Sequence, residues 1–176
     1  MEFKDLILER RSIRKYQEAN IEIEEIKEII KDALLAPSWK NGQPARYYVA
    51  NSKEYIDKIK ESLPDFNINS SNNANLVVTT FKKGLSGFNP DGTPTNELGD
   101  LWGAYDLGLA NAYFILAAKE KGYDTLIMGI RDADKIRKVF DIPEDEIIVA
   151  VIALGKKQVD SKLNPRKELD EVLVIK

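Results

Sequence analysis

The amino-acid sequence predicts an α+β fold, in which helices surround a central sheet that is mixed or antiparallel. Residues 21–35 and 101–121 carry apolar side chains at helical spacing. Residues 76–81 (LVVTTF) have a pattern typical of a buried strand, and residues 147–154 form a continuous apolar run that also predicts a buried strand. No internal repeat or linker interrupts this pattern, so residues 1–176 are expected to form one domain.

The N-terminal half is expected to begin with two helices. The first covers residues 3–9, and the second, over 21–35, is the more regular one and is stopped by Pro37. The shorter elements that follow are expected in this order: a strand over 46–51, a helix over 53–63, a polar stretch over 64–75 and the strand over 76–81.

The second half contains a long loop and a long helix. Residues 82–100 are rich in glycine, proline and asparagine, which favours a loop long enough to act as a lid or a binding loop. The helix over 101–121 is followed by Gly122, which suits the left-handed position after a helix end. The remaining elements are expected to be a strand over 125–130, a helix over 132–140, the strand over 147–154, a polar tail over 156–170 and a strand-like segment over 172–175.

Two features predict an intertwined homodimer. The apolar segment 172–175 follows a solvated tail, and such a strand needs an unpaired sheet edge on the same chain or on a partner. The helix over 101–121 is apolar on more than one face, which exceeds what a small monomer normally buries. A C-terminal strand exchanged between two subunits explains both features.

Composition excludes several kinds of chemistry. The formal net charge of -3 argues against general nucleic-acid binding. No apolar run has transmembrane length and the first residues do not resemble a secretory signal, so we expect no membrane association and a cytoplasmic protein. The chain has no cysteine and no histidine, which excludes thiolate nucleophiles, Ser-His-Asp triads and typical zinc sites. Demanding chemistry would therefore come from an organic cofactor.

Two short motifs, separated by one helix, give the strongest functional signal. In 10–14, the segment Arg10-Arg11-Ser12-Ile13-Arg14, three guanidiniums and a hydroxyl form a plausible grip for a dianion. In 36–44, the sequence APSWKNGQP offers amide and hydroxyl groups on a proline-stiffened loop, suited to the edge of a flat polar ring. Together they indicate a phosphate-bearing, ring-containing cofactor, and flavin mononucleotide (FMN) fits this description. The alternative for the first motif is a solvated basic turn between two helices.

Four sequence blocks occur in an order typical of one family. They are RRSIRKY at 10–16, APSWKNGQPARYYV at 36–49, AYDLGLANAYFILAAKEKGYDT at 104–125, and IIVAVIALG at 147–155 followed by Pro165-Arg166. On these blocks the chain resembles the short members of the FMN-dependent nitroreductase family. The resemblance implies an obligate homodimer with two FMN sites at the subunit interface and a C-terminal strand that embraces the partner's sheet.

The resemblance also implies roles for the basic residues. The candidates for the FMN phosphate are Arg10, Ser12 and Arg166, with Arg11 sharing that role or contacting the ribityl chain. Arg14 is expected near flavin N1 and O2, where a fixed cation would stabilise the reduced form. The alternative is that Arg14 pairs with a carboxylate such as Glu18.

The second motif is implied to reach the flavin of the other subunit. Its candidate cofactor residues are Pro37, Ser38, Trp39, Asn41 and Gln43. Asn41 is a candidate hydrogen-bond partner for the flavin or its ribityl hydroxyls, whereas Gln43 could brace the loop instead. Trp39 is bulkier than the residue often found there, so it either narrows the substrate pocket or packs at the dimer interface.

The segment Leu126, Ile127, Met128 and Gly129 is implied to pass the central ring of the flavin. By position in the family, the backbone N–H of Met128 is the expected donor to flavin N5, and the chemistry needs no catalytic side chain or metal. The same residues are also compatible with a plain core strand.

Polar and aromatic residues in the middle of the chain complete the candidates. Asn67 and Asn69 could address the pyrimidine edge of the flavin. The aromatic residues Phe88, Trp102 and Tyr105 could line the substrate face, although packing roles are expected for at least two of them.

The implied activity is that of an NAD(P)H-dependent FMN oxidoreductase of the nitroreductase type. Hydride would pass from NAD(P)H through flavin N5 to a nitroaromatic, quinone or similar electron-poor acceptor by a ping-pong mechanism. The alternative is an FMN-binding storage or regulatory protein with little NAD(P)H turnover.

Overall fold

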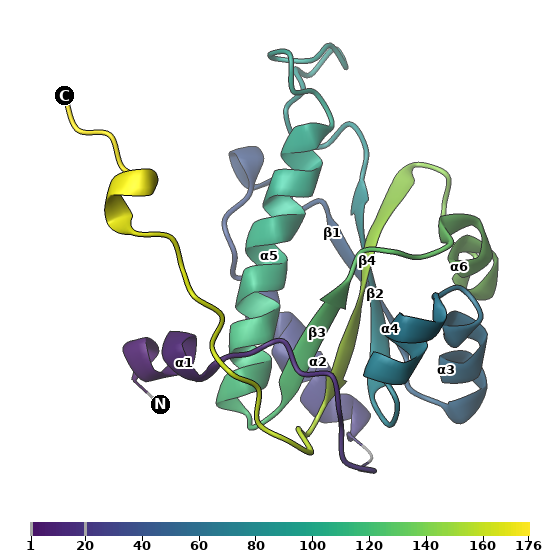
Figure 1. Ribbon diagram of the computed structural model, residues 1–176. Coiled ribbons are helices and arrows are strands. Elements are labelled where there is room, and N and C mark those ends of the chain that lie inside the picture. Colours follow the sequence, from purple (N-terminus) through teal and green to yellow (C-terminus); the bar gives the residue numbers. More distant parts are fainter. Residues whose placement is uncertain (1, 20) are drawn as a thin grey trace.

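A four-stranded antiparallel sheet forms the centre of the computed structural model, which describes residues 2–19 and 21–176 (Figure 1). Its strands pair in the order β1-β2-β4-β3. The bounds are Ala45–Ala50 for β1, Asn75–Lys82 for β2, Asp124–Met128 for β3 and Glu146–Gly155 for β4. All three strand pairings are antiparallel, which decides between the mixed and antiparallel sheets that the sequence allowed.

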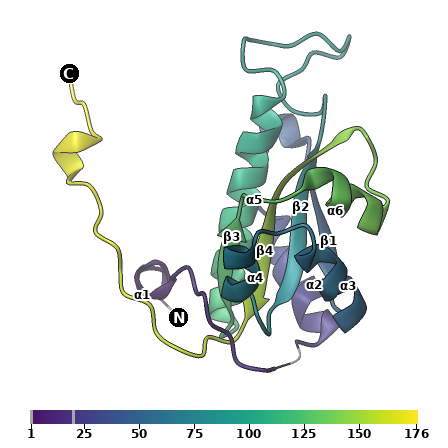
Figure 2. The same cartoon turned by 45° about the vertical axis from the view of Figure 1, so that its right-hand side comes forward.

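Helices cover both faces of this sheet. On one face lie α2 (Ile23–Ala33) and α5 (Leu101–Glu120), and on the other lie α3 (Lys53–Lys60), α4 (Asp65–Ser70) and α6 (Ala133–Phe140) (Figures 1 and 2). A separate apolar core fills each interface, and neighbouring strand residues alternate between the two cores. The two central strands, β2 and β4, are buried on both sides, which explains the continuous apolar run of β4 and the apolar and threonine residues of β2.

The long helix α5 ends where the sequence predicted. Gly122 follows it with a φ of 83°, and its N–H donates to Lys119 O at 3.0 Å while Tyr123 N–H donates to Ala118 O at 2.8 Å. These two bonds form a Schellman motif, which satisfies carbonyls that the helix end leaves free. Only one face of α5 is buried in the chain, whereas Leu101, Tyr105 and Tyr113 are exposed.

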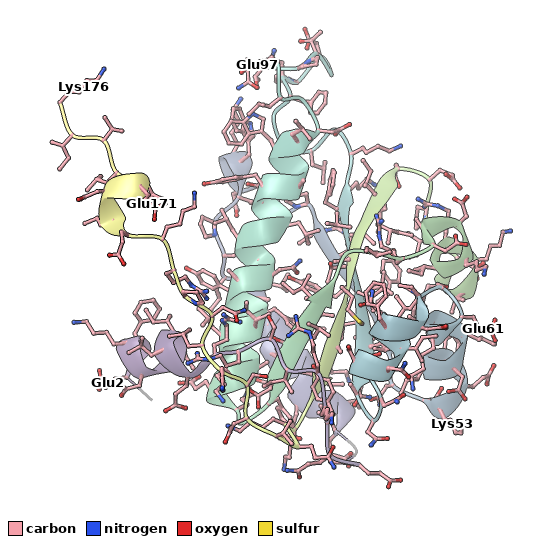
Figure 3. All side chains as sticks on the ribbon, viewed as in Figure 1. Glu2, Lys53, Glu61, Glu97, Glu171 and Lys176 are labelled. Carbon is pink, nitrogen blue, oxygen red and sulfur yellow. The ribbon has the colours of Figure 1, made fainter. Side chains whose placement is uncertain are left out.

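The N-terminal helix and the C-terminal tail both stand away from the sheet. Helix α1 (Phe3–Glu9) has no buried residue, and the tail after β4 leaves the body in both views (Figures 1 and 2). Glu171 and Lys176 lie far out on this tail (Figure 3). A 3₁₀ turn over Leu169–Glu171, closed by a capping box with Glu168, is its one regular element.

Residues 172–175 pair with no described strand of their own chain, so their pairing with the sheet of a partner stays a prediction. One sequence description needs correction. The polar stretch 64–75 contains α4, a six-residue helix without an apolar stripe that its sequence could have revealed. The other predicted helices and strands are confirmed, with ends shifted by up to three residues. Within the described residues, no helix combines the length and apolarity needed to cross a membrane.

Candidate cofactor site

The basic motif 10–14 is attached to the free edge of the sheet. Ser12 forms a parallel bridge with Thr125 of β3, and Ile13 N–H donates to Thr125 O at 3.0 Å. The side chains of Ile13 and Tyr16 are buried in the core, and Tyr16 O–H donates to Ile13 O at 2.9 Å. The backbone of the motif is therefore a fixed part of the fold, while Ser12 and Arg14 are exposed and Arg10 and Arg11 are half-buried.

This attachment brings the basic motif and the C-terminal tail together in a cavity of about 240 Å³, which we call the cation pocket. Its lining residues are Arg10, Arg11, Ser12, Arg14, Ser161, Lys162, Leu163, Asn164 and Arg166. Five of these are cations and none is a carboxylate, although the chain as a whole has a net charge of -3. Such a concentration of like charge is suited to a polyanionic group.

The arginines of the cation pocket differ in what they already contact. The guanidinium of Arg10 has no hydrogen bond or ion pair with any described residue. Burial, followed by the charges of Arg166 and Arg11, lowers the pKa of this guanidinium. Arg11 donates through Nη1 to Leu8 O and, at 2.8 Å, to Arg10 O, while its buried Nε has no partner. Arg10 is thus available to an anion, whereas Arg11 mainly caps the end of α1.

The other two arginines make only local contacts. Arg14 Nη1 donates to Ser12 O at 3.3 Å, and among the described residues no ion pair joins Arg14 to Glu18. Arg166 Nη1 donates to Asn164 O at 3.2 Å. Both guanidiniums retain donors for a ligand, since each could form five hydrogen bonds.

The second motif, which we call the 36–44 loop, has an unusual backbone. It contains a 3₁₀ turn over Trp39–Asn41, and Lys40, Asn41 and Gln43 have φ values of 46°, 57° and 46°. The left-handed region costs a non-glycine residue roughly 1–2 kcal/mol, less for asparagine. Gln43 holds the turn, because its N–H donates to Ser38 Oγ at 3.0 Å and its Nε2 donates to Asn41 Oδ1 at 3.2 Å.

A residue that the sequence analysis missed anchors this loop to α5. Asp106 is only 4% exposed, and its Oδ2 accepts hydrogen bonds from Trp39 N–H at 2.9 Å and from Ser86 Oγ at 2.6 Å. A carboxylate on the mostly apolar face of a long helix was the available signal. The ring of Trp39 packs on Trp102 at 4.7 Å, and Tyr105 meets Trp102 edge-on at 5.6 Å, so these aromatics form a cluster within the chain.

The two motifs do not meet within one chain. The 36–44 loop is tied to Asp106 near the start of α5. The basic motif lies at the other end of α5. There, Lys119 of α5 pairs with Asp124, and Asp124 lines the same cavity as Arg11. The 13 residues from Asp106 to Lys119 correspond to about 20 Å of helix.

The segment 126–129 leaves the sheet beside the basic motif. Met128 is buried and is the last residue of β3 that pairs with β4, opposite Val151, while Ile127 is 47% exposed. Gly129 lies beyond the pairing. The following carbonyl, Ile130 O, accepts from Asn67 Nδ2 at 3.0 Å.

The remaining candidates have different surroundings. Asn69 is exposed on α4, whereas Asn67 is buried and supports the backbone after β3. Phe88 is half-buried in the 83–100 loop, where it forms a bridge with Pro94. Among the described residues, no group of acidic side chains is arranged to hold a metal ion.

Comparison with known proteins agrees with this fold. The model of the family described as "Nitroreductase family" matches residues 7–156. The chain belongs to this family. A protein of Archaeoglobus fulgidus named "Putative NADH dehydrogenase/NAD(P)H nitroreductase" is 29% identical over 171 residues, which cover 91% of this chain and 92% of that protein.

Solved structures of the nitroreductase family have the same fold as this chain. A family protein from Streptococcus pneumoniae superposes with a TM-score of 0.87 at 18% identity, covering 99% of this chain and 100% of the other. A protein from Exiguobacterium sibiricum, solved in complex with FMN, superposes with a TM-score of 0.82 at 23% identity, covering 100% and 98%. At these identities the likeness shows the fold alone.

Proposed function

We propose that this nitroreductase-family chain is an FMN-dependent oxidoreductase that uses NAD(P)H to reduce nitroaromatics, quinones or similar electron-poor acceptors. It would act as a homodimer in which each chain, residues 1–176, is one FMN-binding domain. The main support is the cation pocket, which collects five cations and no carboxylate at the edge of β3. FMN, when bound, would supply the hydride chemistry at N5, accepting from NAD(P)H and donating to the acceptor in a ping-pong cycle.

The cation pocket has the chemistry that a flavin phosphate needs. A buried dianion is costly unless charge-assisted hydrogen bonds replace its water. Arg10, Ser12 and Arg166 would supply these bonds. Burial, and then the charges of Arg166 and Arg11, lower the pKa of the Arg10 guanidinium, so a bound anion would favour its charged form. Arg14 would set a fixed positive charge near the pyrimidine end of the ring, where it raises the flavin's reduction potential.

The 36–44 loop would reach the ring of the partner's flavin with Pro37, Ser38, Trp39 and Asn41. Its distance from the basic motif within one chain supports a site shared between two subunits. Gln43 already holds Ser38 and Asn41, so its role would be to keep the loop in shape. Asn69 would approach the pyrimidine edge from α4.

The chain would contribute orientation and exclusion of water rather than a catalytic side chain. Leu126, Ile127 and Gly129 would lie along the central ring, with the backbone N–H of Met128 directed to N5. A backbone donor is fixed by the sheet, so it requires no reorganisation during hydride transfer. The absence of histidine is compatible with this mechanism because no protein general acid is needed.

Exposed apolar residues support the homodimer. They are Phe3, Ile7 and Leu8 on α1, Leu101, Tyr105 and Tyr113 on α5, and Leu163, Leu169, Val172, Leu173, Val174 and Ile175 on the tail. So many exposed large apolar side chains support the proposal that part of this surface is covered by a partner. A partner would cover α5 and offer a sheet edge to residues 172–175.

The test is the visible absorption spectrum of the purified protein, followed by anaerobic addition of NADH and then of NADPH. We expect a bound-flavin spectrum that bleaches rapidly with at least one nicotinamide, and parallel double-reciprocal plots when donor and acceptor are varied. A flavin spectrum that persists with both donors would favour the storage or regulatory alternative. A protein that neither carries nor takes up FMN would refute the proposal.

A further inference from the structure

We propose that Asp106 is a positioning residue for the flavin-binding site: its buried carboxylate holds the 36–44 loop in its strained shape and joins it to the 83–100 loop. This inference rests on the proposed function, because it assigns the 36–44 loop to the flavin. Asp106 itself would not touch the cofactor. It would act through the backbone of Trp39.

The first argument is the shape of the loop. Left-handed non-glycine residues persist only where surrounding contacts determine the backbone more strongly than the residue's own preference. Lys40 and Gln43 are such residues. Among the described residues, two side chains from other elements hydrogen-bond the backbone of the loop: Arg46 of β1 donates to Gln43 O at 2.9 Å, and Asp106 of α5 accepts from Trp39 N–H at the 3₁₀ turn. The bonds made by Ser38 and Asn41 lie inside the loop, so they cannot fix its position on the body of the protein.

The second argument is the cost of burying the carboxylate. A buried carboxylate is unfavourable unless it is paired or well hydrogen-bonded. Asp106 has no ion-pair partner among the described residues, and both of its hydrogen bonds converge on Oδ2. A cavity of about 20 Å³, lined by Asp106, Ser38 and Gln43, lies beside it and has room for one water. The hydrogen bonds from Trp39 N–H and Ser86 Oγ therefore compensate for the burial of the Asp106 carboxylate.

The third argument is the close approach of the two loops. Ser86 Oγ donates to the same oxygen as Trp39 N–H, so one atom binds both loops. Gly42 packs against the same segment, since a Cβ there would lie 3.2 Å from Leu85 O and 3.1 Å from Trp39 O. A displacement of the 83–100 loop would thus reach the 36–44 loop through Asp106.

The two tryptophans give a direct measure of the loop geometry. They are the chain's only tryptophans, Trp39 on the loop and Trp102 on α5, and their rings are 4.7 Å apart. Near-ultraviolet circular dichroism of the flavin-free protein therefore reports whether Trp39 keeps its position. This signal does not depend on flavin chemistry.

The experiment compares Asp106→Ala with Asp106→Asn and with Ser86→Ala. The readouts are the Kd for FMN, from quenching of flavin fluorescence, and the near-ultraviolet dichroism of the flavin-free protein. For Asp106→Ala we expect a roughly tenfold or greater increase in Kd, because a charge-assisted bond is lost, and a weakened tryptophan signal. Asp106→Asn keeps a carbonyl oxygen that accepts both bonds, so it should retain most of both properties. Ser86→Ala should give a smaller increase in Kd.

The matched control is Glu146→Ala. Glu146 is also a buried carboxylate whose Oε2 accepts two side-chain hydroxyls, Tyr48 Oη at 2.9 Å and Thr80 Oγ1 at 2.5 Å, and it lies outside both loops. The Glu146→Ala variant should lose stability, as Asp106→Ala does, but should keep the FMN affinity and the tryptophan dichroism of the unaltered protein. An Asp106→Ala protein with unchanged Kd and dichroism would overturn the positioning role alone, as would an equal effect of Glu146→Ala on FMN affinity. If the unaltered protein fails to bind FMN, the proposed function is wrong and the positioning role falls with it.

Discussion

Replacing Arg10 by alanine should weaken FMN binding without lowering the stability of the flavin-free protein. Burial and the charges of Arg166 and Arg11 lower the pKa of the Arg10 guanidinium in the folded state. A base whose folded pKa is lowered is disfavoured in its charged form by folding. The alanine variant relieves this unfavourable effect and at the same time removes a donor from the cation pocket.

The magnitude follows from the bonds that Arg10 can make. Its guanidinium has no partner among the described residues, so the guanidinium donors are available to a phosphate. A hydrogen bond between charged groups contributes about 1.5–3 kcal/mol, which corresponds to an increase in Kd of roughly 10- to 150-fold. The free energy of unfolding of the flavin-free variant should equal or exceed that of the unaltered protein, within about 0.5 kcal/mol.

The assay combines FMN titration at two salt concentrations with urea unfolding of the flavin-free protein. Lys53→Ala is the control, because it also removes one positive charge but from a side chain on α3 that is 89% exposed. The Lys53→Ala variant should change neither the Kd for FMN nor the free energy of unfolding. The reasoning is refuted if Arg10→Ala binds FMN as tightly as the unaltered protein, or if it loses more than about 1 kcal/mol of stability.

Three further predictions concern stability and assembly. Lys119 and Asp124 form a buried ion pair at 3.1 Å, with side chains 9% and 3% exposed, so Lys119→Met should cost about 3–5 kcal/mol in urea unfolding by leaving a buried charge unpaired; a loss below about 1 kcal/mol would contradict this. Burial, and then the hydrogen bond to Glu146, raises the pKa of Tyr48 to about 12. Its neutral phenol therefore contributes stability that is complete below about pH 10 and lost as the pH rises towards 12, and Tyr48→Phe should flatten that decline in unfolding measured against pH. Truncation after Asn164 should lower both FMN occupancy and dimer content in size-exclusion chromatography, and a stable, flavin-loaded dimer would argue against the roles proposed for Arg166 and the tail.

The elements that the sequence predicted best are those with strong local signals. The helix that became α2 has a regular apolar stripe, and α5 ends at Gly122 because only a residue tolerant of positive φ suits that position. The apolar runs of β2 and β4 identified strands buried on both faces. In contrast, α4 depends on tertiary contacts, such as the bond from Asn67 to Ile130 O, which its polar sequence does not encode locally.

Some features of the candidate site were likewise evident from the sequence, whereas others required the structure. The chemistry of the basic motif was evident from Arg10, Ser12 and Arg14, since guanidiniums and hydroxyls have the same donors wherever they occur. Asp106 was missed because its partner, Trp39, is 67 residues away in the chain. The role of Gln43 as a brace required the observed distances, since the sequence allowed both a brace and a ligand contact.

The sequence by itself determined the helices and strands with clear periodicity, the absence of histidine and cysteine chemistry, and the positive charge of its basic motif. These properties depend on the residues themselves or on neighbours within a few positions. Only the tertiary structure decided that residues 10–14 meet residues 161–166 in one pocket, and that the 36–44 loop lies at the other end of α5. Contacts of this kind join segments far apart in the chain, and their geometry follows from the packing of both faces of the sheet.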